Sequence, residues 1–444
     1  MRLLWASGPA DKGSDLWRRR RTMTWCGVVF VAGLLVRLAL LWVASGPETR
    51  IGGEPISIAR SLAATGAYAD AYGAGVGPTA HCAPLHPLLV SVLFRLFGTG
   101  QAGSLVVAAF GCMAAAMAFA FLPALAVAGQ LSRRAGVLAG MAGALLPVNY
   151  WSQTSGSFDA PYTALALAAL FFLLCRSCQA GQFAKSEALQ FGAVAGLACL
   201  LNPVLSTVLT AWAVTCLVRR RSQWRPILAF FAIVSLCVVC ILAPWSLRNY
   251  LALGSPIWTR SNFGLELQVS NNDILTADLE RNVRDPQFGL LHPFRGAGER
   301  AKVHAMGEVA YQRSKLRQAI SWITGHKARF LRLTVERFRL FWLPNMRRPW
   351  QAVFEAALTI SGLCGLALLF YRRHAFAWVA ATALFAYPAV YYIIQVSPRY
   401  RFPLEPLLFL LSTYAAMEVT RMIAARGSTN SRAAGGRLSK ATKA

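Results

Sequence analysis

Charged residues are scarce in this sequence, and acidic ones are the scarcest. Asp, Glu, Lys and Arg make up 14% of the 444 residues, with 18 acidic side chains against 45 Lys and Arg. Hydrophobic residues make up 56%, and the mean hydropathy is positive at +0.45. Soluble domains carry about 25% charged residues, so this composition excludes an ordinary soluble domain and is typical of a membrane protein.

Cysteines outside the apolar runs are almost missing as well. Of ten cysteines, nine lie within or at the edges of such runs, and Cys82 is the exception, so a disulfide framework is not expected. Cys175 and Cys178 form a C-x-x-C pair without a second pair or a neighbouring His, which does not favour zinc or redox chemistry. No residues have the spacing of a dedicated metal site, although a divalent metal could still assist.

A cleavable signal peptide is also not indicated. The first apolar run, residues 24–44, is long enough to span a membrane and stay there. The net charge of +27 does not indicate nucleic-acid binding, because the basic residues are dispersed in short clusters at the ends of apolar runs. These clusters are Arg18–Arg21, Arg133–Arg134, Arg219–Arg221 and Arg372–Arg373. They mark the cytoplasmic side under the positive-inside rule.

Together these patterns predict an all-α polytopic membrane protein with ten spans. The expected spans are residues 23–44, 104–128, 137–150, 162–174, a pair between 189 and 217 broken at Asn202-Pro203, 227–245, 352–371, 376–394 and 403–422. The expected domains are a disordered, basic cytoplasmic tail (1–22), a catalytic bundle (23–246) with a first outer loop (46–85), a long outer loop (247–350), the last spans (351–422) and a second basic cytoplasmic tail (423–444).

The outer loops carry helices of their own. A short helix is expected to follow Glu54 and end at Gly66, and Leu85–Phe97 is apolar but too short to span, which predicts a helix lying against the membrane. Residues 306–342 alternate charged with apolar side chains, and this pattern predicts an amphipathic helix.

The predicted topology gathers most of the candidate site residues on the outer face. They are Glu54, His81, His86, Asp159, Arg248, Asn271, Asn272, Arg399, Tyr400 and Arg401. Arg37, in the outer half of the first span, either snorkels to the surface or pairs with an anionic headgroup or carboxylate. A sugar linked to a lipid through phosphate needs cations on the leaving phosphate and a carboxylate to deprotonate the acceptor hydroxyl. Glu54 or Asp159 could supply the carboxylate.

Four blocks of this sequence resemble a known family. GGEPISIARSLAATG with GPTAHCAPLHPLL, APWSLRNYLALGSPI with SNFGLELQVSNN, AISWITGHKARFLRLTVERFRLFW and PRYRFPLEPLL are similar to the polyprenyl-phosphate-sugar-dependent glycosyltransferases of the GT-C fold. Within these, the sequence most resembles glycosyltransferase family 39, the protein-mannosyltransferase-like and aminoarabinose-transferase-like proteins.

The resemblance implies a GT-C-like bundle with juxtamembrane helices in the first outer loop. It implies inverting sugar transfer from a polyprenyl phosphate to a glycan, lipid or protein, with Glu54 as the base, at the periplasmic or exterior face of the cell's inner (plasma) membrane. Gly53 stands where the family often has an Asp before the Glu, so the pair is reduced to one carboxylate, and Asp159 could compensate.

Simpler interpretations remain open for each residue. Glu54 could be a solvated loop acid, Asp159 a helix cap, Arg399 and Arg401 headgroup anchors, His81 and His86 packed loop histidines, and Asn271-Asn272 a turn. Two other functions also remain open: a transporter or flippase for lipid-linked sugars, and a non-catalytic membrane scaffold.

Overall fold

The computed structural model describes residues 12–44, 51–180, 183–346 and 348–441, and this part of the chain is helical. Strand pairing among the described residues is limited to two isolated bridges, Ala69 with Pro78 and Asp278 with Val396. The predicted all-α class is therefore confirmed. Residues 1–11 and 45–50, parts of the predicted N-terminal tail and first outer loop, lie outside the described residues.

Helices occupy every predicted span. They are α1 (Lys12–Ala44), α4 (Gln101–Ala120) with α5 (Leu122–Ala128), α6 (Arg133–Leu145), α8 (Ala160–Ala180), α9 (Lys185–Leu201), α10 (Leu205–Arg219), α11 (Trp224–Leu253), α18 (Pro349–Tyr371), α19 (Phe376–Ala386) with η2 (Tyr387–Tyr392), and α21 (Glu405–Ala441). Within the described residues six stretches are long and apolar enough to cross a membrane, so this is a multi-pass membrane protein.

Prolines account for several of the helix ends. The chain breaks between α9 and α10 at Asn202-Pro203, as the sequence predicts, and α6 stops two residues before Pro147. Pro388 falls where α19 gives way to the tighter η2. The tails differ from expectation, because α1 already begins at Lys12 and α21 continues to Ala441, well beyond the predicted spans.

Small residues let the long helices approach closely. A Cβ atom at Gly365 of α18 would lie 2.0 Å from the carbonyl oxygen of Leu411 in α21, and one at Gly192 of α9 would lie 2.7 Å from Cys237 of α11. Helices in a lipid environment associate through such close packing because lipid tails are as apolar as the helices themselves. The bundle is therefore held by contacts that a single methyl group would disrupt.

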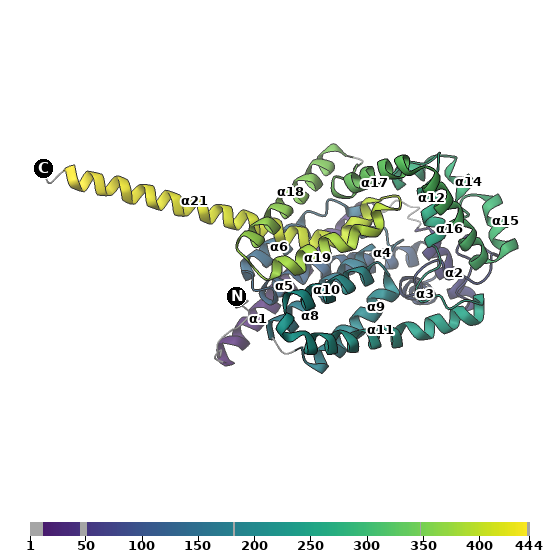
Figure 1. Ribbon diagram of the computed structural model, residues 1–444, viewed down its shortest axis with the longest axis horizontal. Coiled ribbons are helices and arrows are strands. Elements are labelled where there is room, and N and C mark those ends of the chain that lie inside the picture. The colour runs from purple at the N-terminus through teal and green to yellow at the C-terminus, as the bar shows by residue number, and fades with distance from the viewer. Residues whose placement is uncertain (1–11, 45–50, 181–182, 347, 442–444) are drawn as a thin grey trace.

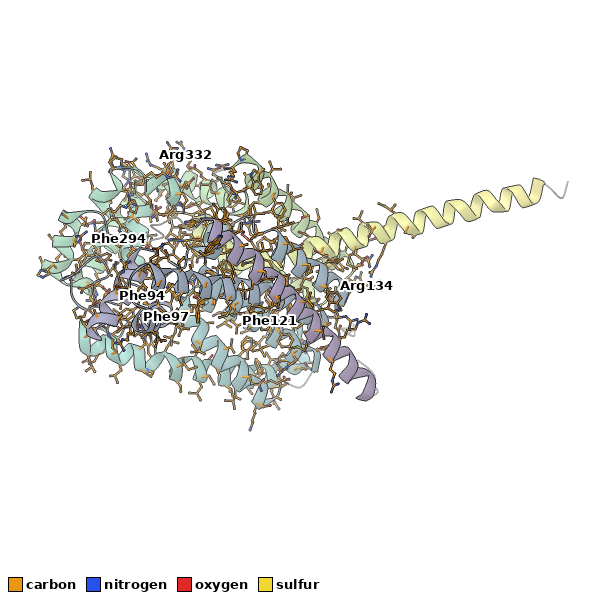
Figure 2. The ribbon with its side chains drawn as sticks, turned by 180° about the vertical axis from the view of Figure 1, so that it is seen from behind. Phe94, Phe97, Phe121, Arg134, Phe294 and Arg332 are labelled. Carbon is orange, nitrogen blue, oxygen red and sulfur yellow. The ribbon has the colours of Figure 1, made fainter. Side chains whose placement is uncertain are left out.

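The remaining helices lie in the loops between the predicted spans. They are α2 (Glu54–Thr65), α3 (Leu85–Phe97), α7 (Tyr150–Thr154), α12 (Phe263–Ser270), α13 (Leu279–Asn282), α14 (Phe288–Leu291), α15 (Ala297–Met306), α16 (Glu308–Gly325), α17 (Lys327–Trp342) and α20 (Pro398–Arg401), with 3-10 turns η1 (Arg221–Gln223) and η3 (Phe402–Leu404) elsewhere in the fold. Figure 1 shows α2, α3 and α14–α16 at the end opposite to the one from which α21 leaves the body. In Figure 2, Phe294 lies at that same end and Arg134 near the start of the protruding α21.

Two sequence predictions for this end compare directly with the structure. Helix α3 has the predicted bounds, Leu85–Phe97. The predicted amphipathic helix over 306–342 is instead two helices, because α16 ends at Gly325 and α17 starts at Lys327. Glycine has the lowest helix propensity after proline, which accounts for a break at this point.

Candidate functional site

A cavity of about 800 Å³ lies beside Glu54. Its walls come from the ends of six segments of the chain: α1, the start of α2, the α7 region, α12, the α13–α14 region and the segment before and within α20. The polar side chains that line it include Glu54, Glu266, Glu280, His292, Arg295, Gln395, Arg399 and Tyr400. Carboxylates and cationic side chains thus line the same cavity.

Glu54 is the first residue of α2, and the backbone before it explains its placement. Gly53 has φ 101° and ψ 173°, and its carbonyl accepts hydrogen bonds from the backbone N–H groups of Ile56 (3.1 Å) and Ser57 (3.0 Å). L-residues rarely adopt this φ, so Gly53 sets the turn that delivers Glu54 to the cavity. The Glu54 side chain keeps about 20% of its surface exposed. Burial raises the pKa of the Glu54 carboxyl, and the charges of Arg399 and Arg295 oppose that shift.

Two arginines supply positive charge to the same cavity. The Arg399 guanidinium lies 3.6 Å from the centroid of the Phe158 ring and donates to the Tyr400 hydroxyl at 3.1 Å. Among the residues that the structure describes, Arg399 forms no ion pair. Arg295 donates to the Val283 carbonyl at 2.7 Å. Arg399 therefore has charge to offer to a bound anion.

The segment that carries Arg399 and Tyr400 is clamped from a distant part of the chain. The N–H of Leu279 donates to the Val396 carbonyl, and the N–H of Val396 donates to the Ala277 carbonyl, both at 2.9 Å. The Ser397 hydroxyl donates to Glu280 Oε1 at 3.0 Å. Residues 277–280 therefore fix the position of the segment that carries Arg399.

Glu266 joins the main cavity to a smaller chamber. That chamber, of about 50 Å³, shares Glu266, Arg399 and Tyr400 with the main cavity and is further lined by Asp159, Asn202, Arg260, Asn262, Tyr387 and Tyr391. Burial raises the pKa of Glu266, and the negative charge of Glu54 raises it further, while the charges of Arg260 and Arg399 lower it. Asp159 accepts a hydrogen bond from the Thr163 hydroxyl at 3.0 Å. Glu54 and Asp159 thus line neighbouring chambers rather than one.

Arg401 and Arg37 lie inside the helical bundle rather than in the cavity. Arg401 is buried and pairs with Glu355 of α18, and it also donates to the Thr359 hydroxyl at 2.9 Å. Arg37 is fully buried and donates to Gln153 Oε1 at 2.8 Å and to the backbone carbonyls of Gly33, Gly143 and Ala144. Neither of the predicted alternatives for Arg37 is seen, because it bonds to an amide and carbonyls within the protein.

Five other predicted site residues hold the loops together away from the cavity. Arg248 donates to the carbonyls of Tyr68 and Thr79 and lies over the Trp245 ring, 5.2 Å from its centroid. His81 is hydrogen-bonded through Nδ1 to the Tyr72 hydroxyl at 2.7 Å, and His86 packs against the Tyr162 ring. Asn271 donates to two carbonyls, and Asn272 accepts from the N–H groups of Ile274 and Leu275, which closes a turn.

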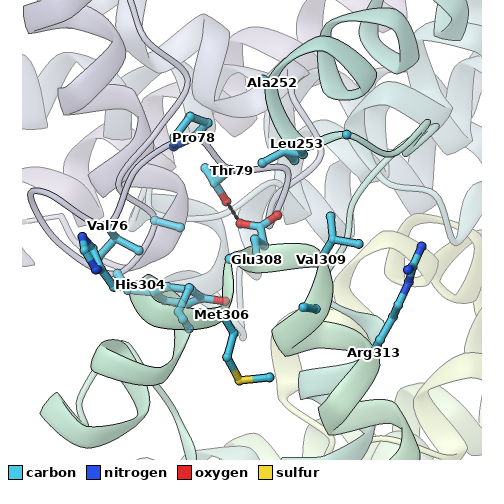
Figure 3. Close-up of a pocket in the computed structure, with 16 residues that line it drawn as sticks. Val76, Pro78, Thr79, Ala252, Leu253, His304, Met306, Glu308, Val309 and Arg313 are labelled. Atoms are coloured by element: carbon cyan, nitrogen blue, oxygen red, sulfur yellow. Dashed lines mark hydrogen bonds between the residues drawn. The ribbon is translucent and has the colours of Figure 1, made fainter.

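A second cavity, of about 510 Å³, lies between the loop at residues 71–79, the end of α11 and the α15–α16 turn. Figure 3 shows Glu308 hydrogen-bonded to Thr79 at its base, with His304, Met306 and Arg313 around it. Glu308 also accepts from the Ala80 N–H at 2.7 Å and the Ser261 hydroxyl at 2.6 Å. The Glu308 carboxylate therefore joins the start of α16 to Thr79 and Ala80 through hydrogen bonds.

Sequence reasoning missed several residues of the main cavity. Glu266 lies within the SNFGLELQVSNN block that resembles the family, so that block was a usable signal. His292, Arg295 and Arg260 lie in the long outer loop outside the quoted blocks, and only the fold brings them to Glu54 and Asp159. Within the described part of the chain, no group of three or more His, Cys, Asp or Glu side chains has metal-binding geometry.

The arrangement of helices is that of the GT-C membrane glycosyltransferase fold. The chain superposes on the oligosaccharyltransferase of Archaeoglobus fulgidus in its apo form with a TM-score of 0.54 and 15% identity, covering 92% of this chain and 52% of that one. For the same enzyme tethered to an acceptor peptide containing an NVT sequon, the TM-score is 0.52 and the identity 14%, over 90% and 50% of the two chains. This chain spans about half the length of the oligosaccharyltransferase.

A third structure overlaps less closely. It is ArnT from Cupriavidus metallidurans bound to undecaprenyl phosphate, with a TM-score of 0.39 and 15% identity over 88% of this chain and 77% of that one. The fold is shared with the oligosaccharyltransferase structures. No family model and no curated protein sequence matches this chain.

Proposed function

We propose that this chain is a membrane glycosyltransferase that moves a sugar from a polyprenyl-phosphate donor to an acceptor hydroxyl or phosphate. One observation carries the proposal: the Glu54 carboxylate and the cations of Arg399 and Arg295 line the same cavity of about 800 Å³. A cavity of this size accommodates a ligand with several polar groups. The GT-C fold is consistent with this chemistry but does not establish it.

The proposed reaction is a single inverting displacement. The acceptor oxygen forms a bond to the anomeric carbon of the sugar while the bond from that carbon to the phosphate oxygen breaks. The polyprenyl phosphate leaves with the electron pair, and when the acceptor is a hydroxyl its proton passes to Glu54. Arg399 and Arg295 stabilise the negative charge that develops on the phosphate, which favours the transition state over the ground state.

The other polar side chains then take supporting roles. Glu266 and Tyr400 line both chambers and could accept or donate hydrogen bonds to sugar hydroxyls. Asp159 lies in the smaller chamber with Arg260 and is a secondary carboxylate in this proposal. Arg37, His81, His86, Arg248, Asn271, Asn272 and Arg401 support the fold around the site. No step of the proposed reaction requires a metal ion.

The proposed setting is the outer face of the cell's inner (plasma) membrane. The cavity lies at the end of the bundle opposite to Arg133-Arg134, and the positive-inside rule assigns such basic clusters to the cytoplasm. The donor then presents its phosphate at the membrane surface, and the acceptor, a glycan, lipid or protein, approaches from the exterior. The transferred sugar in this proposal is a hexose or a pentose.

The test is transfer by the purified protein in lipid nanodiscs supplied with a panel of synthetic undecaprenyl-phosphate sugars. We expect release of undecaprenyl phosphate with formation of a glycoside of inverted anomeric configuration, which NMR of the product reports. In sealed vesicles, translocation of an intact donor without cleavage would instead indicate the transporter. A protein that neither cleaves nor moves any donor would support the scaffold.

A further inference from the structure

His292 is held in one tautomer by its own loop. The backbone N–H of Phe294 donates to His292 Nδ1 at 3.2 Å. A ring nitrogen that accepts a hydrogen bond carries no proton, so the neutral imidazole has its proton on Nε2. That second nitrogen lies 3.8 Å from Glu54 Oε1. The ring therefore directs an N–H group towards the carboxylate.

The orientation of the ring is fixed by packing on two sides. His292 stacks on Phe288 with a centroid distance of 5.1 Å and an interplanar angle of 12°, and the Tyr72 ring meets it edge-on at 6.3 Å. Its side chain is only 6% exposed. The packing holds the plane of the ring, and the hydrogen bond from Phe294 to Nδ1 favours the orientation in which Nε2 faces Glu54.

His292 is also neutral at physiological pH. Burial lowers the pKa of its imidazole to about 4. Of the charged groups around the ring, the carboxylates raise this pKa and the cations lower it further. Those groups are Glu54, Glu266, Glu299, Lys315 and Arg295. A neutral ring has an N–H group to offer to Glu54 without adding the full positive charge that would make the carboxylate a much weaker base.

From this geometry we propose that His292 is a positioning residue: it holds Oε1 of Glu54 and leaves Oε2 as the oxygen that takes the acceptor's proton. The inference rests on the proposed function of Glu54 as a base. The separation of 3.8 Å is longer than a hydrogen bond, so the proposal requires a rotation of the Glu54 carboxylate towards Nε2 that is made in the substrate-free protein as well.

Two substitutions of His292 distinguish hydrogen-bond donation to Glu54 from packing of the ring on Phe288. His292→Gln keeps an N–H donor near the position of Nε2, whereas His292→Phe keeps the stacked ring and loses the donor. We expect His292→Phe to lower kcat by about 10- to 100-fold, the factor of a hydrogen bond to a charged group, with the KM for the undecaprenyl-phosphate sugar little changed. His292→Gln should recover most of that loss. Full activity in His292→Phe, or equal losses in both variants, would overturn the inference.

The matched control is His326→Gln. His326 stacks on Trp322 with a centroid distance of 4.9 Å and an interplanar angle of 15°, so the substitution removes a comparable stacked ring from an exposed site outside both cavities. We expect this variant to keep wild-type kcat. A comparable loss of activity in His326→Gln would show that the assay responds to a substitution remote from Glu54, so the loss at position 292 could not be assigned to donation.

A measurement without substrate distinguishes failure of this inference from failure of the proposed function. The Glu54 carboxyl band is isolated as the infrared difference between wild type and Glu54→Gln, and it is titrated with pH. Loss of a donor to the charged form should move the Glu54 titration to higher pH in His292→Phe and less so in His292→Gln. An unchanged titration in His292→Phe would refute the coupling, even if no sugar transfer were found.

Discussion

At the scale of single residues, burial and charge act on Glu54 in opposite directions. Burial favours the protonated carboxyl, while Arg399 and Arg295 favour the carboxylate, and the balance leaves the pKa raised. A base with a raised pKa holds a proton more strongly once it has accepted it, and general-base catalysis is most efficient when the pKa of the base approaches the working pH. The surroundings of Glu54 therefore suit it to deprotonate an acceptor hydroxyl.

The first prediction concerns pH. Glu54 must be deprotonated to act, so kcat/KM should fall as pH decreases through its pKa, and this acid limb should lie above pH 4.5, the ordinary value for Glu. The limb should vanish in Glu54→Gln, measured over the same range with the same donor. An acid limb that persists unchanged in Glu54→Gln would assign it to another group.

The second prediction separates two neighbouring arginines. Arg399→Ala should raise the KM for the donor while the protein remains folded, because Arg399 lines the cavity without a carboxylate partner among the described residues. Arg401→Ala should instead destabilise the protein, because it leaves Glu355 buried without its partner, and such losses cost about 3–5 kcal/mol. Donor titrations and thermal unfolding in detergent measure the two effects.

The double variant Arg401→Met with Glu355→Leu provides the control for this second prediction. Replacing a buried ion pair by apolar side chains is often close to neutral, so the double variant should recover much of the lost stability. A stable Arg401→Ala with a raised donor KM would contradict the structural role and place Arg401 in the site.

The residue scale also shows where sequence reasoning stops. Glu54 could be singled out because it is the acid within the GGEPISIARSLAATG block that resembles the family. Arg401 could not be distinguished from Arg399, because both lie in one short PRYR segment and only the turn of α20 sends one to the cavity and the other into the bundle. His292 and Arg295 reach the cavity through the folding of a long loop, which no local pattern encodes.

At the scale of elements, the start of α2 depends on a backbone conformation that suits glycine. Gly53 has φ 101°, and a Cβ atom there would lie 3.4 Å from the Phe158 ring, the same ring that Arg399 covers. A side chain at position 53 would therefore press on Phe158, the ring on which the Arg399 guanidinium rests. The missing Asp before Glu54 is therefore a matter of geometry as well as of charge.

The third prediction follows from this conformation. Gly53→Asp restores the acidic pair that the family resemblance leads one to expect, but it places a side chain in a strained conformation that costs about 1–3 kcal/mol. We expect lower thermal stability and lower turnover than wild type, with Gly53→Ala showing the same loss of stability. Increased turnover in Gly53→Asp would mean that the second carboxylate outweighs the strain.

Element boundaries were predictable where a residue dictates them. Asn202-Pro203 marks the α9–α10 turn, and the apolar run of α3 sets both of its ends. The split between α16 and α17 was missed, because an amphipathic pattern that continues across a glycine does not reveal the break at Gly325–His326. The helical extensions of the tails were missed because basic composition indicates a location, not a conformation.

At the scale of the whole molecule, α11 is long enough to cross the membrane from one side to the other. Helix α11 has 30 residues, about 45 Å at 1.5 Å per residue, and runs from the basic turn at 219–223 to the loop that begins at Gly254. Its last residues line the second cavity together with Ala71 and Val76 of the first outer loop. The class of fold was predictable from hydropathy and the basic clusters, whereas the juxtaposition of the loops was not.

The fourth prediction tests orientation with introduced cysteines. Ala74 is exposed in the first outer loop, and Ser222 is exposed in the turn before α11. An impermeant thiol reagent should label Ala74→Cys in intact cells and Ser222→Cys only after lysis, with the parent protein reporting background from Cys82 and the other native cysteines. The reverse pattern would place the cavity on the cytoplasmic face.

The central claim is that Glu54 takes the proton from the acceptor, and single-turnover sugar transfer by Glu54→Gln tests it most directly. Gln keeps the shape of the side chain and removes the proton acceptor, and general bases typically contribute about 10²- to 10⁴-fold. We expect turnover to fall at least about a hundredfold with donor affinity little changed, while Asp159→Asn, which keeps an oxygen for Thr163, stays within about tenfold of wild type. Near-normal turnover in Glu54→Gln together with loss of activity in Asp159→Asn would contradict the account and transfer the role of base to Asp159.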